Sequence, residues 1–353
     1  MVSGLSTAIP IRPAEGEQEE RKSQALSQLA RELTPYLAER NVVDVVVNPD
    51  GKIWVNRIGA GFEPVGAFFT QQIKLLLAQV AAIQGVDLSH DNPILETDFP
   101  LDGSRIEGLL SPVVRGAALA LRPHPKKIFT IEDYESAGII THKNDSRNKL
   151  RHKDWFLEKA RAAESHGTVI KLMVQFRRNV LIVGSTGAGK STLGNMFLDL
   201  IYRITPKDRV VTIEDTMELQ CRVPNSIALF ASARSRISME QCLEASMRLK
   251  PDRIVVGEVR RRAAAVMLLQ AWNTGHRGGI ATVHAEDAIS GLHRLEQLLP
   301  RDYTSVRPEI ARAVDAVVFI DEDDEISAGR KVREVMVVKG YDEARDRYEL
   351  EYV

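Results

Sequence analysis

The segment GSTGAGKS, from Gly184 to Ser191, constrains the fold of this 353-residue chain more than any other feature. It matches the pattern G-x-x-x-x-G-K-[S/T], follows the apolar run NVLIV and precedes the helical sequence STLGNMFLDLI. Its glycines let the backbone turn so that successive N–H groups point at a bound phosphate. The segment therefore predicts a buried strand, a phosphate-binding loop and a helix, in that order.

Each position of this loop has an expected task in binding ATP and Mg²⁺. Lys190 neutralises the β and γ phosphates, and Ser191 offers its hydroxyl group to Mg²⁺. The N-terminus of the following helix adds a partial positive charge. The predicted nucleotide-binding residues are Gly184, Ser185, Thr186, Gly187, Ala188, Gly189, Lys190, Ser191 and Thr192.

Three further apolar strands, RVVTI, RIVV and GIATV, each end at a polar residue. These residues are Glu214 with Asp215, then Glu258, and then His284. Ligands of an open parallel sheet bind beyond the carboxyl ends of its strands, so we expect the four side chains to converge on the phosphates. A surface residue after a buried strand would explain any one of them, but the repetition favours a site.

The roles expected for these residues follow from the needs of phosphoryl transfer. Glu258 positions the attacking water, while Glu214 or Asp215 reaches Mg²⁺ through a water molecule. Which of Glu214 and Glu258 is the stronger base stays open. His284 lies where a ring N–H can meet the γ-phosphate. Gly257 occupies the place where an aspartate often holds the metal, and we interpret it as packing room beside the ion.

The rest of the chain predicts a second, smaller unit and a link. Residues 1–16 mix Pro, Gly and Ser and are expected to form a disordered tail. Residues 17–140 alternate helical and strand patterns, including a hairpin around NPDG, and predict an α+β domain. Residues 141–165 form a basic linker and helix, and residues 166–353 alternate strands and helices as an α/β domain does.

Charge and composition exclude several classes of function. The formal net charge of −1 gives no global attraction to nucleic acid, and no sequence-specific nucleic-acid binding is expected. Basic runs near residues 143–153 and 260–262 are either solvated surface or contacts with acidic lipid. No apolar run approaches the ~20 residues of a membrane span, which predicts a cytoplasmic location. Cys221 and Cys242 are expected to be free thiols.

The phosphate loop, the acidic TIEDTMEL, the Gly-Glu strand in RLKPDRIVVGEVR and the histidine segment TGHRGGIATVHA occur in that order. Together they resemble the secretion ATPase superfamily, most closely the hexameric traffic ATPases of type IV secretion and conjugative DNA transfer. The stretches TDFPLDGSRIEGLLSPVVRG and FTIEDY strengthen the resemblance. It implies a RecA-like P-loop ATPase domain preceded by a smaller α+β N-terminal domain.

The resemblance also implies partners and further site residues. It predicts a homohexamer that hydrolyses ATP to drive substrate transfer or pilus assembly, at the cytoplasmic face of the bacterial inner membrane with inner-membrane channel components. Arg105 and Arg122 stand where the N-terminal domain of such ATPases supplies arginines to the nucleotide, in cis or in trans; Arg248 and Arg260 compete for this role. A pilus-assembly ATPase of the tight-adherence type and a nucleotide-gated assembly scaffold with little turnover remain alternatives.

Overall fold

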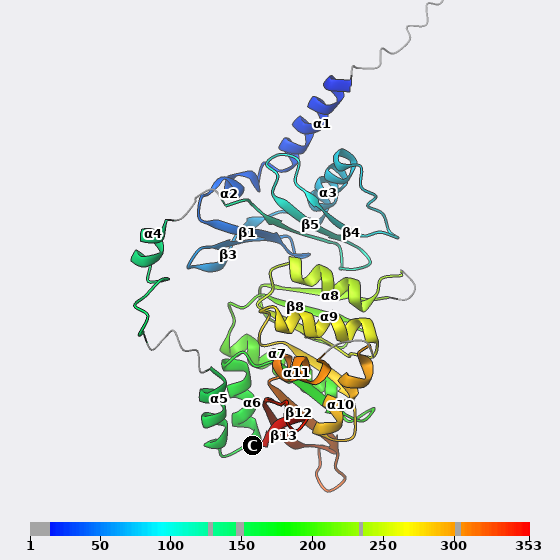
Figure 1. Ribbon diagram of the computed structural model, residues 1–353. Helices are drawn as coiled ribbons and strands as arrows, with labels where there is room; N and C mark the ends of the chain where they lie inside the picture. The colour runs from blue at the N-terminus through cyan, green and yellow to red at the C-terminus, as the bar shows by residue number, and fades with distance from the viewer. Residues whose placement is uncertain (1–14, 126–129, 146–151, 233–235, 301–304) are drawn as a thin grey trace, which may run out of the picture.

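Two β-sheets dominate the computed structural model, which describes residues 15–125, 130–145, 152–232, 236–300 and 305–353 (Figure 1). Most of the predicted disordered tail, residues 1–14, lies outside the described residues. Helix α1 (Glu15–Leu29) begins two residues earlier than the sequence pattern predicts.

The first sheet is antiparallel and has the strand order β3-β2-β1-β6-β5-β4. Its strands are β1 (Val42–Val47), β2 (Lys52–Arg57), β3 (Gly61–Ala67), β4 (Ile94–Asp98), β5 (Arg105–Leu110) and β6 (Ala117–Arg122). Helices α1, α2 (Thr34–Ala38) and α3 (Thr70–Gln84) cover one face. The predicted hairpin around NPDG is confirmed by the antiparallel pairing of β1 with β2.

Strand β1 shows why this sheet is covered on both sides. Its sequence VVDVVV is apolar at nearly every position, where a strand with one wet face would alternate. Val45 and Val47 pack among the helices of this half, whereas Val46 belongs to the core shared with the second half of the chain. The second face of the first sheet therefore rests on the C-terminal half.

The second sheet has eight strands in the order β14-β13-β12-β7-β11-β10-β8-β9. The strands from β12 to β9 in this order are parallel, and β13 and β14 are antiparallel additions. Their bounds are β7 (Val180–Gly184), β8 (Val210–Glu214), β9 (Ser226–Phe230), β10 (Arg253–Val256), β11 (Ile280–His284), β12 (Ala316–Glu322), β13 (Arg330–Asp342) and β14 (Arg347–Tyr352).

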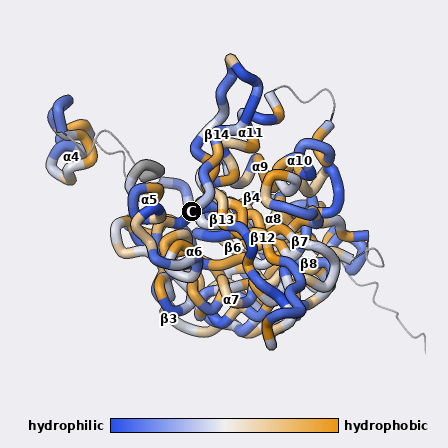
Figure 2. Tube along the Cα trace, turned by 90° about the horizontal axis from the view of Figure 1, so that it is seen from below, coloured by the Kyte–Doolittle hydropathy of each residue, from blue (hydrophilic) through white to orange (hydrophobic). Residues whose placement is uncertain are grey.

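Helices cover both faces of this sheet. Its central strands are therefore buried on both sides, and their sequences are continuous apolar runs. On one face lie α5 (His152–Arg161), α6 (His166–Gln175) and α7 (Lys190–Ile204). On the other lie α8 (Met239–Arg248), α9 (Arg262–Asn273), α10 (Ala288–Leu298) and α11 (Val306–Ala313). In Figure 2 the hydrophobic segments gather around β12 and β7 in the middle of the body. The predicted α/β fold behind a smaller α+β part is confirmed.

The link between the halves runs outside the body. Helix α4 (Ile131–Ser136) stands apart from both sheets in Figures 1 and 2. The middle of the predicted basic linker, residues 146–151, lies outside the described residues. Within the part of the chain that the structure describes, no helix combines the length and apolar character needed to cross a bilayer.

Polar contacts fix how the two halves meet. Arg209 is fully buried and donates to Oδ1 of Asn48 on the first half at 2.8 Å. The backbone N–H of Phe230, the last residue of β9, donates to the carbonyl of Val113 at 2.8 Å. Arg248 of α8 pairs with Glu96 at 2.8 Å. Because β9 and α8 both contact the first half, its position relative to the eight-stranded sheet is defined.

Candidate active site

The phosphate loop joins β7 to α7 and needs glycine at three positions. At Gly184, a Cβ atom would collide with the carbonyl oxygen of Ile320 on the adjacent strand β12. Gly187 and Gly189 have φ angles of 86° and 97°, in the left-handed region that favours glycine. At Gly189, a Cβ atom would also lie 2.6 Å from Nη1 of Arg330. The loop therefore exposes backbone to a cavity of about 580 Å³ that Lys190 and Ser191 also line.

Lys190 is buried at the centre of this loop, with its side chain folded back on the loop itself. Its ammonium group donates to the carbonyl oxygens of Gly184 at 3.0 Å and Ser185 at 2.7 Å. It also lies 3.1 Å from Nδ1 of His284. Burial lowers the pKa of Lys190, and the charge of Glu258 opposes that shift. Since carbonyl oxygens hold the ammonium group only as neutral acceptors, a phosphate can replace them at this position.

His284 connects Lys190 to Glu258. It ends β11 in register with Gly184 of β7, so the parallel pairing places it beside the loop. Its Nε2 lies 2.9 Å from Oε1 of Glu258. With Nδ1 accepting from the ammonium group of Lys190, a neutral ring carries its proton on Nε2, which lies close to Oε1 of Glu258 without forming a hydrogen bond with it. The predicted residues Lys190, His284 and Glu258 thus form one continuous chain.

Glu258 follows β10 and is held as a carboxylate. The hydroxyl of Thr282 donates to the carbonyl of Gly257 at 2.6 Å, which fixes the backbone just before it. Arg260 donates to Oε2 of Glu258 at 2.7 Å. Burial by itself raises the pKa of Glu258, but the hydrogen bond from Arg260 and the charges of His284, Arg260 and Lys190 outweigh it and hold the pKa below its ordinary value. Glu258 is therefore ionised and can accept a proton.

Glu214 and Asp215, which are predicted to reach Mg²⁺ through a water molecule, contact other parts of the chain in this structure. The Oε1 atom of Glu214 accepts from the backbone N–H groups of Glu218 at 2.9 Å and Leu219 at 2.8 Å, so it turns back onto its own chain. Burial raises the pKa of Glu214, although these two hydrogen bonds oppose the shift. Asp215 instead pairs with Arg260 at 3.2 Å. Neither of the two carboxylates is hydrogen-bonded to Ser191.

Glu218, which was not predicted from the sequence, lies next to Ser191. Its carboxylate contacts the hydroxyl group of Ser191, and it lines the cavity at the phosphate loop. Asn195, one helical turn after Ser191, supports this segment by donating to the carbonyl of Glu218 at 2.9 Å. The hydroxyl and carboxylate oxygens of Ser191 and Glu218 are the hard donors that suit Mg²⁺.

Gly257 also has a different neighbour from the one predicted. A Cβ atom there would lie 3.1 Å from Cγ of Glu214. Its small size therefore makes room for the buried side chain of Glu214, one strand away in the sheet. Packing room at Gly257 beside the ion stays a prediction; in this structure the side chain of Glu214 lies next to Gly257.

Arg105 and Arg122 do not reach this cavity. They are cross-strand neighbours on β5 and β6, and Arg122 pairs with Asp44 at 2.9 Å. Both line a separate cavity of about 360 Å³ between the first sheet and α8, together with Arg248. Of the four arginines considered from the sequence, the structure brings only Arg260 to the phosphate loop, through Glu258.

Sequence reasoning missed five residues that line the cavity, Asn195, Met217, Glu218, Gln220 and Arg330. Glu218 lies in the acidic TIEDTMEL segment and Asn195 lies four positions after Ser191 on α7, so both had a local signal. Arg330 had none, because it reaches the loop through the pairing of β12 with β13.

Comparisons with known proteins agree with this geometry. The family model described as "Type II/IV secretion system protein" matches residues 151–323. Conjugal transfer protein TrbB of Rhizobium radiobacter is 35% identical over 314 residues, which cover 89% of this chain and 88% of that protein. A probable conjugal transfer protein TrbB of Sinorhizobium fredii is 36% identical over 324 residues, covering 92% and 90% of the two chains.

Among solved structures, the VirB11 ATPase from the Brucella suis type IV secretion system superposes with a TM-score of 0.80. It is 24% identical and the match covers 90% of this chain and 96% of that one, so it supports the fold. The resemblance inferred from the sequence is confirmed by the two TrbB matches, each of which covers about nine tenths of both chains. The chain belongs to the type II/IV secretion system protein family, as an ATPase of its type IV secretion and conjugal-transfer members.

Proposed function

We propose that this protein is a homohexameric motor that hydrolyses ATP to drive substrate transfer or pilus assembly at a conjugative type IV secretion channel. The observation that carries the proposal is the chain from Lys190 through His284 to Glu258, built on the phosphate loop. A protein that only bound nucleotide would not need an ionised, half-buried carboxylate held by Arg260 next to the phosphate-binding lysine.

In this proposal each residue has one task in the reaction. Lys190 leaves the carbonyls of the loop for the β and γ phosphates. Glu258 orients a water molecule and accepts its proton as the water oxygen bonds to the γ-phosphorus. The bond from the γ-phosphorus to the bridging oxygen then breaks, and ADP and inorganic phosphate leave. His284 links the two groups, so that loss of the γ-phosphate changes the position of both Lys190 and Glu258.

Mg²⁺ fits the oxygen donors at the start of α7. Ser191 would bind it directly and Glu218, which contacts the Ser191 hydroxyl, would reach it directly or through water. The ion would offset the negative charge of the nucleotide phosphates.

Assembly completes the site in this account. Arg105 and Arg122 line another cavity in their own chain, so in the hexamer they act on the γ-phosphate of a neighbouring copy. Residues 17–140 move against residues 166–353, with residues 141–165 as the link. Mixing inactive Arg105→Ala and Lys190→Ala chains tests action in trans: activity should return in mixed rings, and no recovery would refute it.

The motor acts at the cytoplasmic face of the inner membrane, on channel components held there, and the basic runs near residues 143–153 and 260–262 provide a peripheral contact with acidic lipid. Sedimentation with vesicles of acidic lipid and with vesicles of neutral lipid tests this contact. Equal sedimentation with both would exclude the electrostatic attraction.

The central test is phosphate release from ATP as a function of protein concentration, with the native mass measured on the same samples. Wild type should gain specific activity as a hexamer forms, and Lys190→Ala should lose both turnover and nucleotide binding. Lys207→Ala removes an exposed lysine of the same half and should behave as wild type. Nucleotide binding and assembly without phosphate release would overturn the motor and favour a nucleotide-gated scaffold.

A further inference from the structure

Arg330 lies against the phosphate loop but belongs to a distant part of the chain. It is the first residue of β13 and pairs with Glu322, the last residue of β12. The β12–β13 hairpin therefore ends at the loop. The guanidinium Nη1 of Arg330 and its Cδ lie 2.6 Å and 2.9 Å from the position of a Cβ atom on Gly189. Glu322 approaches Gly187 in the same way, with Oε1 3.7 Å from the corresponding position.

The charge of Arg330 is available to a ligand. The side chain of Arg330 is exposed and lines the cavity at the phosphate loop. Its guanidinium group forms no ion pair or hydrogen bond with the residues that the structure describes. Arg333, on the same strand, differs: it pairs with Asp323 at 3.1 Å and donates to the carbonyl of Glu322 at 3.1 Å. An arginine held beside a phosphate-binding loop without a carboxylate partner matches a phosphate oxygen in charge and geometry.

The order of strands shows which phosphates Arg330 faces. Strand β7 carries the loop, and β11 and β10, which carry His284 and Glu258, lie on one side of it. Strand β12 and its hairpin lie on the other side. Lys190 points from the loop toward His284, which places the reacting end of the nucleotide on the β11 side. Arg330 therefore approaches the end of the nucleotide that does not react.

We propose that Arg330 binds the α and β phosphates of the nucleotide, the groups that ATP and ADP share. This inference rests on the proposed function, because it assigns a ligand group within the same nucleotide site. Arg330 acts in its own chain, in contrast to the two arginines of the first sheet, and holds the nucleotide in place before and after hydrolysis without taking part in the bond-breaking step.

The test compares three variants by calorimetric titration with ADP and with a non-hydrolysable ATP analogue, both with Mg²⁺. Arg330→Ala should weaken both ligands by the same factor, about tenfold or more, since hydrogen bonds to charged groups are worth about 1.5–3 kcal/mol. Arg330→Lys should recover part of the affinity. Lys331→Ala, which removes the neighbouring exposed cation outside the cavity, should match wild type. Thermal unfolding without nucleotide verifies that the variants fold.

Steady-state kinetics add a second readout. The KM for ATP should rise in Arg330→Ala, while kcat stays within about twofold of wild type, as expected for an interaction made equally in ground and transition states. Unchanged ADP affinity in Arg330→Ala overturns the inference. So does a loss limited to the ATP analogue and to kcat, which would make Arg330 a γ-phosphate ligand.

These outcomes separate the inference from the proposed function. If wild type hydrolyses ATP but Arg330→Ala binds ADP as wild type does, only the assignment of Arg330 fails. If wild type binds ADP in an Arg330-dependent way but releases no phosphate, the motor fails and the assignment of Arg330 stands.

Discussion

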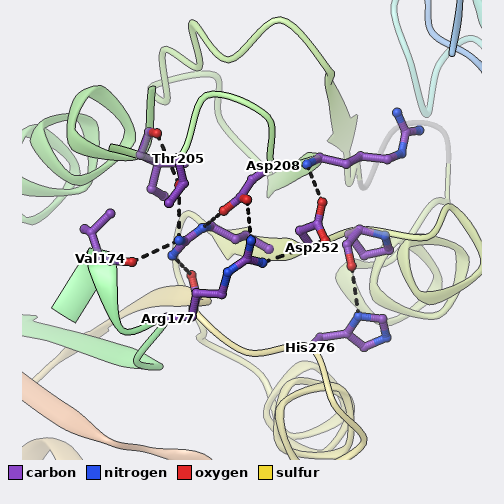
Figure 3. Close-up of polar contacts among 11 residues, drawn as sticks. Val174, Arg177, Thr205, Asp208, Asp252 and His276 are labelled. Carbon is purple, nitrogen blue, oxygen red and sulfur yellow. Dashed lines mark hydrogen bonds and ion pairs between the residues drawn. The ribbon is translucent and has the colours of Figure 1, made fainter. Parts of the chain in front are cut away.

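The two ends of the eight-stranded sheet carry the same kinds of charged residue but use them differently. At the amino ends of β8 and β10, Arg253 is 1% exposed and donates to Asp208 at 2.6 Å and to the carbonyl of Val174 at 3.0 Å. Arg177 pairs with the same carboxylate at 2.6 Å (Figure 3). At the carboxyl ends, the ammonium group of Lys190 donates hydrogen bonds to carbonyl oxygens. The carboxylate of Glu258 forms ion pairs with His284 and Arg260.

The two ends differ in whether each charged group has hydrogen-bond and ion-pair partners that are fixed within the fold. The buried charges of the amino end are satisfied by fixed partners within the fold, and His276, the second histidine of its segment, lies there 3.3 Å from the carbonyl of Pro251. Burial lowers the pKa of His276, and this histidine does not line the cavity at the phosphate loop. At the carboxyl end the partners of Lys190 are weak acceptors, which a ligand can replace. Exchangeable partners, more than charge itself, distinguish a site from a structural network.

Breaking the amino-end network should have the largest effect on stability. Asp208→Asn leaves two arginines, Arg253 and Arg177, without their common carboxylate, and loss of one member of a buried ion pair costs about 3–5 kcal/mol. Urea denaturation measures this loss. The folded fraction should still bind ADP as wild type does. Asp199→Asn, which breaks an exposed pair with Arg203, should cost less than about 1 kcal/mol. Equal stability of Asp208→Asn and wild type would contradict the comparison.

Glu107 extends the comparison to a buried carboxyl group that has neither a fixed hydrogen-bond partner within the fold nor a partner that a ligand could replace. It faces α8 at the junction between the halves, and neither carboxyl oxygen has a hydrogen-bond partner. Burial raises its pKa to about 8; nearby Arg248 opposes the shift, and Glu96 and Glu244 add to it. A raised carboxyl pKa gives stability at low pH that is lost as the pH rises toward the folded-state pKa.

The free energy of unfolding should therefore fall between about pH 5 and 8 by roughly 1 kcal/mol per pH unit from this group. Glu107→Gln should remove that part of the slope and be more stable than wild type at pH 8. Urea denaturation across this pH range measures both quantities. An identical slope in the variant would show that Glu107 ionises as freely when folded as when unfolded.

A smaller effect is expected at the carboxyl end from Glu218. In Glu218→Gln the Mg²⁺ concentration needed for half-maximal turnover should rise about tenfold, because a charged oxygen donor near the ion becomes neutral. Binding of ADP without Mg²⁺ should not change. Glu164→Gln, at an exposed glutamate far from the loop in sequence, serves as the control. An unchanged Mg²⁺ requirement would return the metal role to Glu214 or Asp215.

Sequence reasoning succeeded where chemistry depends on contiguous residues and parallel strands. The loop around Lys190, and the convergence of Glu258 and His284 on it, follow from strand ends that must meet at one edge. Sequence reasoning did not predict the positions of side chains that depend on local backbone hydrogen bonds. The carboxylate of Glu214 is captured by two N–H groups that follow it, and this turn brings Glu218 to Ser191.

Other positions depend on contacts that no local pattern encodes. Arg330 reaches Gly189 only because β12 pairs beside β7, an order of strands that the sequence does not specify. Arg105 and Arg122 depend on how the first half docks on α8. Such docking depends on polar contacts such as that of Arg209 with Asn48 and on apolar contacts across the interface, including those of Val46 and Trp54.

The most direct test of the central claim is ATP turnover of Glu258→Gln measured together with its affinity for nucleotide. The account predicts nucleotide affinity within about threefold of wild type and turnover lower by about 10²–10⁴-fold, the usual contribution of a general base. Normal turnover in Glu258→Gln, with the variant folded and nucleotide bound, would show that the carboxylate held between His284 and Arg260 does not activate the water.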